Sequence, residues 1–212
     1  LVFISTGNNN NSKNENTDYD LGYFNNEHTN LSTPADSMNN ITIGAAADGL
    51  YDGVFQGISM GKEFPAIYSR KDHVDLEALT PASKPNKNLF KPDVLESGGD
   101  YGFYSPGIID HMDNAAMSVL SANPAFGYTK QVGTSLSAPL AANLAAKLKF
   151  AYPDLKSQTL KALIINGASN KNILFPDPHK PLLTRTSGYG LIDIEQTIFS
   201  NENGATLILE DK

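Results

Sequence analysis

The stretch from residue 135 to about residue 152 constrains the fold more than any other part of the chain. Most positions in it are apolar, and they leave a helix formed there with almost no polar face. Pro139 falls in its first turn, where the missing N–H group costs little. A helix that is apolar all round belongs inside a domain. We therefore expect other elements to cover this helix.

Short apolar runs bounded by turn residues predict the strands of such a domain. They cover residues 1–4, 41–46, 66–69, 116–120 and, in the tail, 205–209. Residues 91–95 lead into Ser97-Gly98-Gly99, which indicates another strand end or a turn. A second helix is expected over residues 155–166, with Asp154 or Ser157 as its N-cap and Gly167 just after its end. Short strands that alternate with buried helices predict an α/β domain with a mainly parallel sheet.

The amino-acid composition of the chain argues against several classes of function. The chain has 16 Lys and Arg against 23 Asp and Glu, a net charge of −7, which disfavours sequence-independent binding of nucleic acid. It has no Cys, so thiolate metal sites and Cys nucleophiles are excluded. No apolar run approaches the roughly 20 residues that a membrane-spanning helix needs. Residues 8–40 are rich in Asn and predict a long polar loop.

The segment directly before the long helix carries the most chemical information. It reads Gly133-Thr134-Ser135-Leu136-Ser137-Ala138-Pro139. It puts small hydroxyl residues where a helix begins, and the N–H groups and partial positive charge there suit a developing oxyanion. For an arbitrary serine in this place, the ordinary interpretation is a helix N-cap.

This segment resembles the active-site serine motif of the subtilisin-like serine proteases, the subtilases. The resemblance implies that Ser135 is the nucleophile and that Thr134 shapes the turn that presents it. It also implies a subtilisin-like sheet with helices on both faces. The reaction would be hydrolysis of peptide bonds through an acyl-enzyme on Ser135, without an organic cofactor.

The first eight residues resemble the strand of this family that ends in Ala-Gly-Asn. By that resemblance the Asn8 side chain donates to the oxyanion. Ser5, Thr6 and Gly7 would line one wall of the pocket for the substrate residue before the scissile bond. Taken alone, a Gly-Asn pair only indicates a turn.

Further segments match the family in the expected order. They are Thr33-Pro34-Ala35 before 41–45, Tyr68-Ser69-Arg70, Lys91-Pro92-Asp93-Val94 and 187–193. The resemblance covers about residues 1–199 of one catalytic domain, and 200–212 form a tail. It predicts a cis peptide bond between Thr33 and Pro34. Glu96-Ser97 stands where the family usually has Ala-Pro.

The rest of a catalytic triad is not evident. The four histidines are His28, His73, His111 and His179, and none begins a helix of the kind that carries the subtilase His. We expect the chain to be a fragment or processed product, with the triad Asp and His on an upstream segment of the same protein. Alone it would be inactive. The alternative is a pseudoprotease, a scaffold that binds peptides without cutting them.

Other expectations are less specific. Subtilases often hold calcium in surface loops, and Glu15, Asp18, Asp20 and Glu27 offer oxygen ligands, although a solvated polar loop explains them as well. The residues around Ser69-Arg70 and Gly98-Gly99 resemble a bacterial subgroup found beside AAA-type ATPases. This suggests such an ATPase as a partner, besides a peptide or protein substrate, and favours the bacterial cytoplasm as the location.

Overall fold

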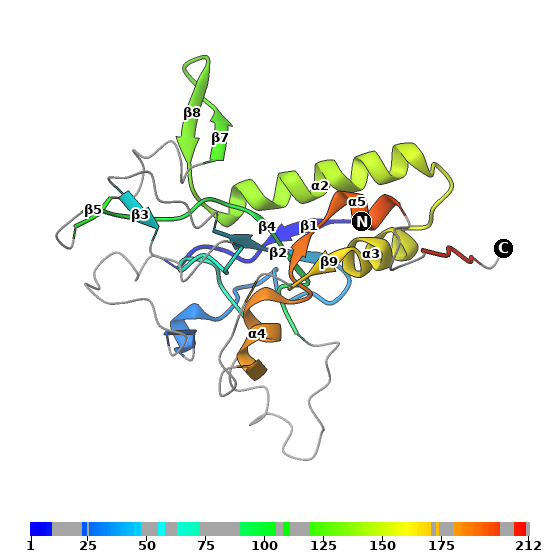
Figure 1. The fold of residues 1–212 in the computed structure, drawn as a ribbon, viewed down its shortest axis with the longest axis horizontal. Helices are drawn as coiled ribbons and strands as arrows, with labels where there is room; N and C mark the ends of the chain where they lie inside the picture. Colours follow the sequence, from blue (N-terminus) through cyan, green and yellow to red (C-terminus); the bar gives the residue numbers. More distant parts are fainter. Residues whose placement is uncertain are drawn as a thin grey trace.

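A five-stranded sheet forms the centre of the structure, which is a computed structural model (Figure 1). It describes residues 1–9, 23–24, 26–47, 55–57, 63–72, 90–104, 108–110, 119–170, 173, 180–199 and 206–210. In spatial order the strands are β1 (Phe3–Ser5), β2 (Ile41–Ala46), β4 (Val94–Ser97), β10 (Leu191–Ile192) and β9 (Ala168–Ser169). All neighbours pair in parallel except β9, which is antiparallel to β10. The predicted α/β class is confirmed.

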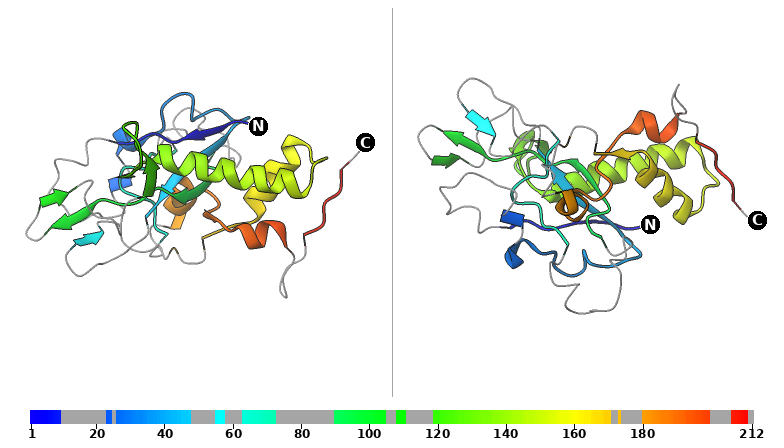
Figure 2. Two further views of the ribbon diagram at one scale, coloured as in Figure 1. Left: turned by 90° about the horizontal axis from the view of Figure 1, so that it is seen from above. Right: turned by 60° about the horizontal axis from the view of Figure 1, so that its bottom comes forward.

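Helices cover both faces of this sheet. The long helix α2 (Thr134–Ala151) lies along the sheet, and with α3 (Ser157–Asn166) and α5 (Ile194–Ile198) it encloses one apolar cluster (Figure 2). Val94 of β4 belongs to that cluster. The next residue, Leu95, belongs to a second cluster against which Leu183 of α4 (Lys180–Ser187) packs. Successive strand residues point to opposite faces, which accounts for the two clusters.

The remaining elements are small. Strands β3 (Phe55–Gly57), β5 (Gly102–Tyr104) and β6 (Ile108–Asp110) form an antiparallel sheet, and η3 (Glu27–Thr29) is a single 3-10 turn. Strands β7 (Val119–Ala122) and β8 (Tyr128–Gln131) form a hairpin that stands out beside the start of α2 (Figure 1). The run predicted over 116–120 thus contributes β7 from Val119 onward, and 116–118 lie outside the described residues.

The expectation that α2 is covered all round is wrong for the described residues. Its buried side chains form a stripe, at Thr134, Ser137, Ala141, Leu144, Ala145 and Leu148. On the other side Leu140 is 38% and Phe150 is 89% exposed. The bounds of the helix agree with the prediction, but the described elements cover only one of its apolar faces.

The strand predicted over 66–69 is a turn. The Ser69 N–H donates to the carbonyl oxygen of Ala66 at 2.8 Å, which closes the chain on itself. Ala66, Ile67 and Tyr68 are nevertheless buried, because the turn packs into the second cluster. Burial rather than strand pairing explains the apolar run. The Thr33–Pro34 peptide bond is cis, as predicted.

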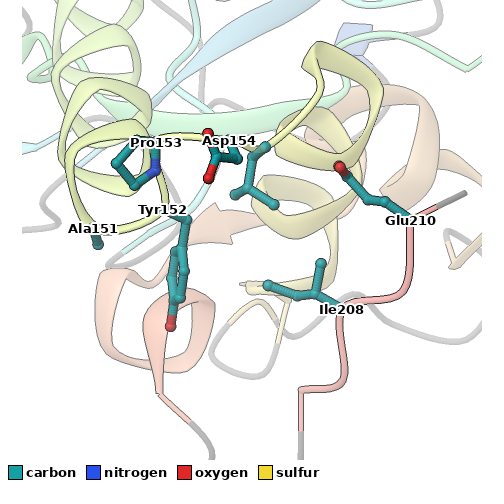
Figure 3. A pocket seen from close by; sticks show the side chains of 7 residues that line it. Ala151, Tyr152, Pro153, Asp154, Ile208 and Glu210 are labelled. Atoms are coloured by element: carbon teal, nitrogen blue, oxygen red, sulfur yellow. The ribbon is translucent and has the colours of Figure 1, made fainter. Parts of the chain in front are cut away.

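The tail contacts α3 instead of adding a strand. Residues 206–210 form no ladder with any described strand. Glu210 Oε1 accepts a hydrogen bond from the Lys156 N–H at 2.9 Å and another from the Thr159 hydroxyl. Ile208 and Glu210 face a groove of about 460 Å³ beside the turn between α2 and α3 (Figure 3). Neither Asp154 nor Ser157 caps α3. The N-cap residue is Lys156, and its N–H donates to the Glu210 carboxylate of the tail.

Charged side chains connect β2, β4 and α3 where the two strands begin. Asp93 Oδ2 accepts from the Thr42 N–H at 2.7 Å and from Lys91 Nζ at 2.5 Å, and Lys161 Nζ lies 3.4 Å from Oδ1. Burial lowers the pKa of Lys91, and Asp93 offsets that effect only in part. The network explains why Lys91 and Asp93 stand beside a core strand.

Among the described helices, none is long and apolar enough to cross a membrane.

Candidate active site

The first turn of α2 presents Ser135 to solvent. Gly133 is the residue before the helix, so Thr134 and Ser135 are its first two residues and neither is the N-cap. The Gly133 N–H donates to the carbonyl oxygen of Gly98 at 2.9 Å, which ties this turn to the end of β4. Thr134 is completely buried, whereas Ser135 is exposed.

Asn8 reaches α2 from the end of β1, 126 residues away in sequence. Its Oδ1 accepts from the Thr134 N–H at 3.0 Å and from the Thr134 hydroxyl at 2.9 Å. A backbone N–H can only donate, so the atom that faces it is the amide oxygen and the Nδ2 group points elsewhere. Asn8 thus accepts from the Thr134 N–H at the start of α2, and its Nδ2 group lies beside Gly133.

The three residues predicted to line the substrate pocket differ in their exposure. Ser5 and Gly7 are partly exposed. Thr6 is completely buried, and its hydroxyl lies 3.3 Å from the hydroxyl of Ser69. A ligand along this strand end would therefore touch Ser5 and Gly7 and would not reach the Thr6 side chain.

The turn that contains Arg70 runs alongside the end of β1. The Asn9 N–H donates to the carbonyl of Tyr68 at 2.7 Å, and the Arg70 N–H donates to that of Gly7 at 3.3 Å. The Arg70 side chain also donates to the carbonyls of Asn8 and Asn30, at 3.4 and 2.9 Å. The sequence interpretation assigned Arg70 no role at the site. A charged residue directly after a buried apolar run was the available signal.

Asn9, the next residue, is buried and its side chain contacts Tyr23. It is 2% exposed, and its side-chain amide donates to the hydroxyl of Tyr23 at 2.7 Å. Of these two neighbouring asparagines, Asn8 is the one that contacts the helix. The role of Asn8 in the oxyanion hole stays a prediction.

No general base or metal site is evident in the described part of the chain. Ser135 Oγ has no hydrogen-bond partner there, and His28 is exposed on η3. His73, His111 and His179 lie outside the described residues, as do Glu15, Asp18 and Asp20. Within that part no three His, Asp or Glu side chains are grouped so that they could hold a metal ion. Calcium binding stays a prediction.

Comparison with known proteins identifies the family. The sequence model of the Subtilase family matches residues 1–190. The chain belongs to the subtilases. A curated relative, an uncharacterized protein of Sinorhizobium fredii (y4bN, strain NBRC 101917 / NGR234), is 26% identical over 196 residues, which are 86% of this subtilase chain and 43% of the relative. The chain thus spans less than half the length of that protein.

Solved structures with a similar fold include two proteases and a macrocyclase. A protease from Pseudoalteromonas arctica has a TM-score of 0.55 at 16% identity, over 92% of this chain and 41% of its own. For the PatG macrocyclase in complex with peptide, the TM-score is 0.51 and the sequence identity is 15%. The match covers 93% of this chain and 41% of the macrocyclase. For the prenylagaramide maturation protease PagA, the TM-score is 0.50 and the sequence identity is 16%. The match covers 93% of this chain and 49% of PagA. At these identities they support the fold, a mainly parallel sheet with helices on both faces.

Proposed function

We propose that this subtilase chain carries the nucleophile and oxyanion hole of a serine endopeptidase. The pairing of Asn8 with Thr134 is the observation that supports this most directly. It joins the Asn8 amide to the residue before Ser135, an exposed serine at the start of α2. These are two of the groups that acyl transfer requires.

In the proposed reaction Ser135 Oγ attacks the scissile carbonyl carbon and gives its proton to a histidine base. The carbonyl oxygen becomes an oxyanion, which accepts hydrogen bonds from the Asn8 Nδ2 group and the Ser135 N–H. The C–N bond then breaks, and the leaving amine takes the proton from the histidine. Water hydrolyses the resulting ester and regenerates Ser135.

The histidine base and its orienting carboxylate are proposed to lie in a part of the protein that precedes Leu1. The chain spans only 41–49% of the three solved proteins described above. The described residues offer Ser135 no base. The ATPase partner and the bacterial cytoplasmic location stay predictions.

Labelling of the whole protein with a fluorophosphonate tests the proposal. We expect one labelled serine, Ser135, and loss of both labelling and peptide hydrolysis in Ser135→Ala. That variant should still bind peptide, because the cleft and the Asn8 amide remain. Ser157→Ala, at the start of α3, is the matched control. Labelling of a different serine would overturn the assignment, and peptide binding without labelling or hydrolysis would favour the pseudoprotease.

A further inference from the structure

The side chain of Arg70 lies over the strand end that leads to Asn8. If Gly7 carried a Cβ atom, that atom would lie 3.2 Å from Arg70 Cδ and 3.5 Å from Ser32 Oγ. Gly7 has a φ of +88°, a conformation that side chains rarely adopt. The absence of a side chain at Gly7 thus lets the Arg70 side chain and the Ser32 hydroxyl lie close to the end of β1.

The guanidinium of Arg70 is only partly engaged. It has five N–H donors, of which two reach the carbonyl oxygens of Asn8 and Asn30. These two bonds fix its position relative to Asn8, whose side chain contacts α2. Arg70 is half-buried and forms no ion pair with any carboxylate in the described part of the chain. A fixed, half-buried guanidinium without a carboxylate partner is suited to bind an anion.

We propose that Arg70 makes this site select an acidic side chain, Asp or Glu, at the substrate residue before the scissile bond. The inference rests on the proposed function and on the family resemblance, which implies that Ser5 and Gly7 line the pocket for that side chain. A carboxylate there would accept from the unused Arg70 donors and from the Ser32 hydroxyl. An apolar side chain would instead cover the guanidinium without satisfying it, which is unfavourable.

A matched peptide series tests the selection. Four peptides differ only in the residue before the scissile bond, which is Glu, Gln, Leu or Lys. With the whole protein we expect kcat/KM for Glu to exceed that for its isostere Gln by about 10- to 100-fold, the range of a charge-assisted hydrogen bond. The ratio compares two peptides on one protein, so a general loss of activity does not change it.

Variants of Arg70 decide whether this residue causes the preference. In Arg70→Met the Glu/Gln ratio should fall to about one, and in Arg70→Lys part of it should remain because the charge is kept. Arg185→Met is the matched control, since Arg185 lies on α4 with its guanidinium carbon 5.9 Å from the centre of the Phe90 ring. A preference for Leu, or a Glu preference that survives Arg70→Met, would overturn the inference.

Peptide binding separates this inference from the proposed function. In Ser135→Ala the same peptides are not cleaved, and their affinity can be measured by fluorescence anisotropy. Tighter binding of the Glu peptide that Arg70→Met abolishes supports the role of Arg70, even if the wild-type protein proves to have no hydrolytic activity. Equal affinity for all four peptides, or no binding of any, counts against it.

Discussion

The two ends of the Asn8 side-chain amide have different roles. Its oxygen caps α2, and its Nδ2 group is the proposed oxyanion donor. Asn8→Asp keeps the oxygen and replaces the donor by a second acceptor, whereas Asn8→Ala removes both. We expect kcat to fall in both variants with little change in KM, because the donor acts on charge that exists only in the transition state.

The loss should be about 10²–10³-fold, the figure known for an equivalent donor in subtilisin, a relative of this chain. Only Asn8→Ala should also lower Tm, because only it leaves the Thr134 N–H unsatisfied. Steady-state kinetics and thermal unfolding of the whole protein measure the two effects separately. Asn9→Ala is the neighbouring control. If it lowers kcat more than Asn8→Ala, the donor has been assigned to the wrong residue.

We propose that Thr134 is a positioning residue, because its hydroxyl donates to Asn8 Oδ1 at 2.9 Å. Thr134→Val removes that donor at similar size, and Thr134→Ser keeps it. A neutral hydrogen bond contributes about 1 kcal/mol, so we expect kcat to fall by roughly fivefold in Thr134→Val. KM should stay constant, and Thr134→Ser should restore kcat. Equal losses in both variants would point to packing of the methyl group instead.

At this scale the sequence predicted Ser135 and Asn8 only through their likeness to family motifs. Spacing alone could not pair Asn8 with Thr134, because their contact depends on how β1 and α2 meet in the folded chain. The place of Arg70 was missed for the same reason. The sequence predicts a strand over 66–69, where the chain instead forms the turn that brings Arg70 to Gly7.

Among the elements, those with a strong local signal were predicted best. The predicted second helix, 155–166, overlaps α3, which spans Ser157–Asn166, and residues 41–46 form β2 as expected. The tail shows why other predictions were wrong. An apolar run in 205–209 indicates a strand, but the described part of the tail lies against α3, which Glu210 contacts through its carboxylate.

That carboxylate makes the docking of the tail depend on pH. The hydrogen bond from Thr159, followed by that from the Lys156 N–H, lowers the pKa of Glu210. An acid whose pKa is lowered in the docked state favours docking above its ordinary pKa of about 4.3, and the effect is lost as the pH falls through the lowered value. We expect the tail to detach from α3 in acid.

An NMR titration measures this detachment. The amide resonance of Lys156 should shift as Glu210 is protonated, together with those of 206–209. In Glu210→Gln the side chain has no charge to lose, so the same resonances should not titrate. Glu195→Gln, on α5, is the control and should behave as the wild type. A wild-type Lys156 amide that does not respond to acid would contradict the prediction.

The molecule as a whole exposes apolar surface where the described elements leave the sheet and α2 uncovered. Strand β1 is at the edge of the five-stranded sheet, and beside it Leu1 and Val2 are 44% and 56% exposed. On α2 the Phe150 side chain is 89% exposed. Unpaired strand edges and exposed apolar side chains both promote association.

We therefore expect purified residues 1–212 to self-associate and to hydrolyse no peptide, since the described residues hold no base for Ser135. Phe150→Ser should reduce association measured by light scattering, with little effect on Tm because the side chain is mostly exposed. Val2→Lys should act similarly by placing a charge at the strand edge. Lys147→Ser, on the exposed side of the same helix, is the control, because it removes no apolar side chain. Two results would count against this account: a monomer at high concentration, and peptide hydrolysis that depends on Ser135, since the latter requires a base within these residues.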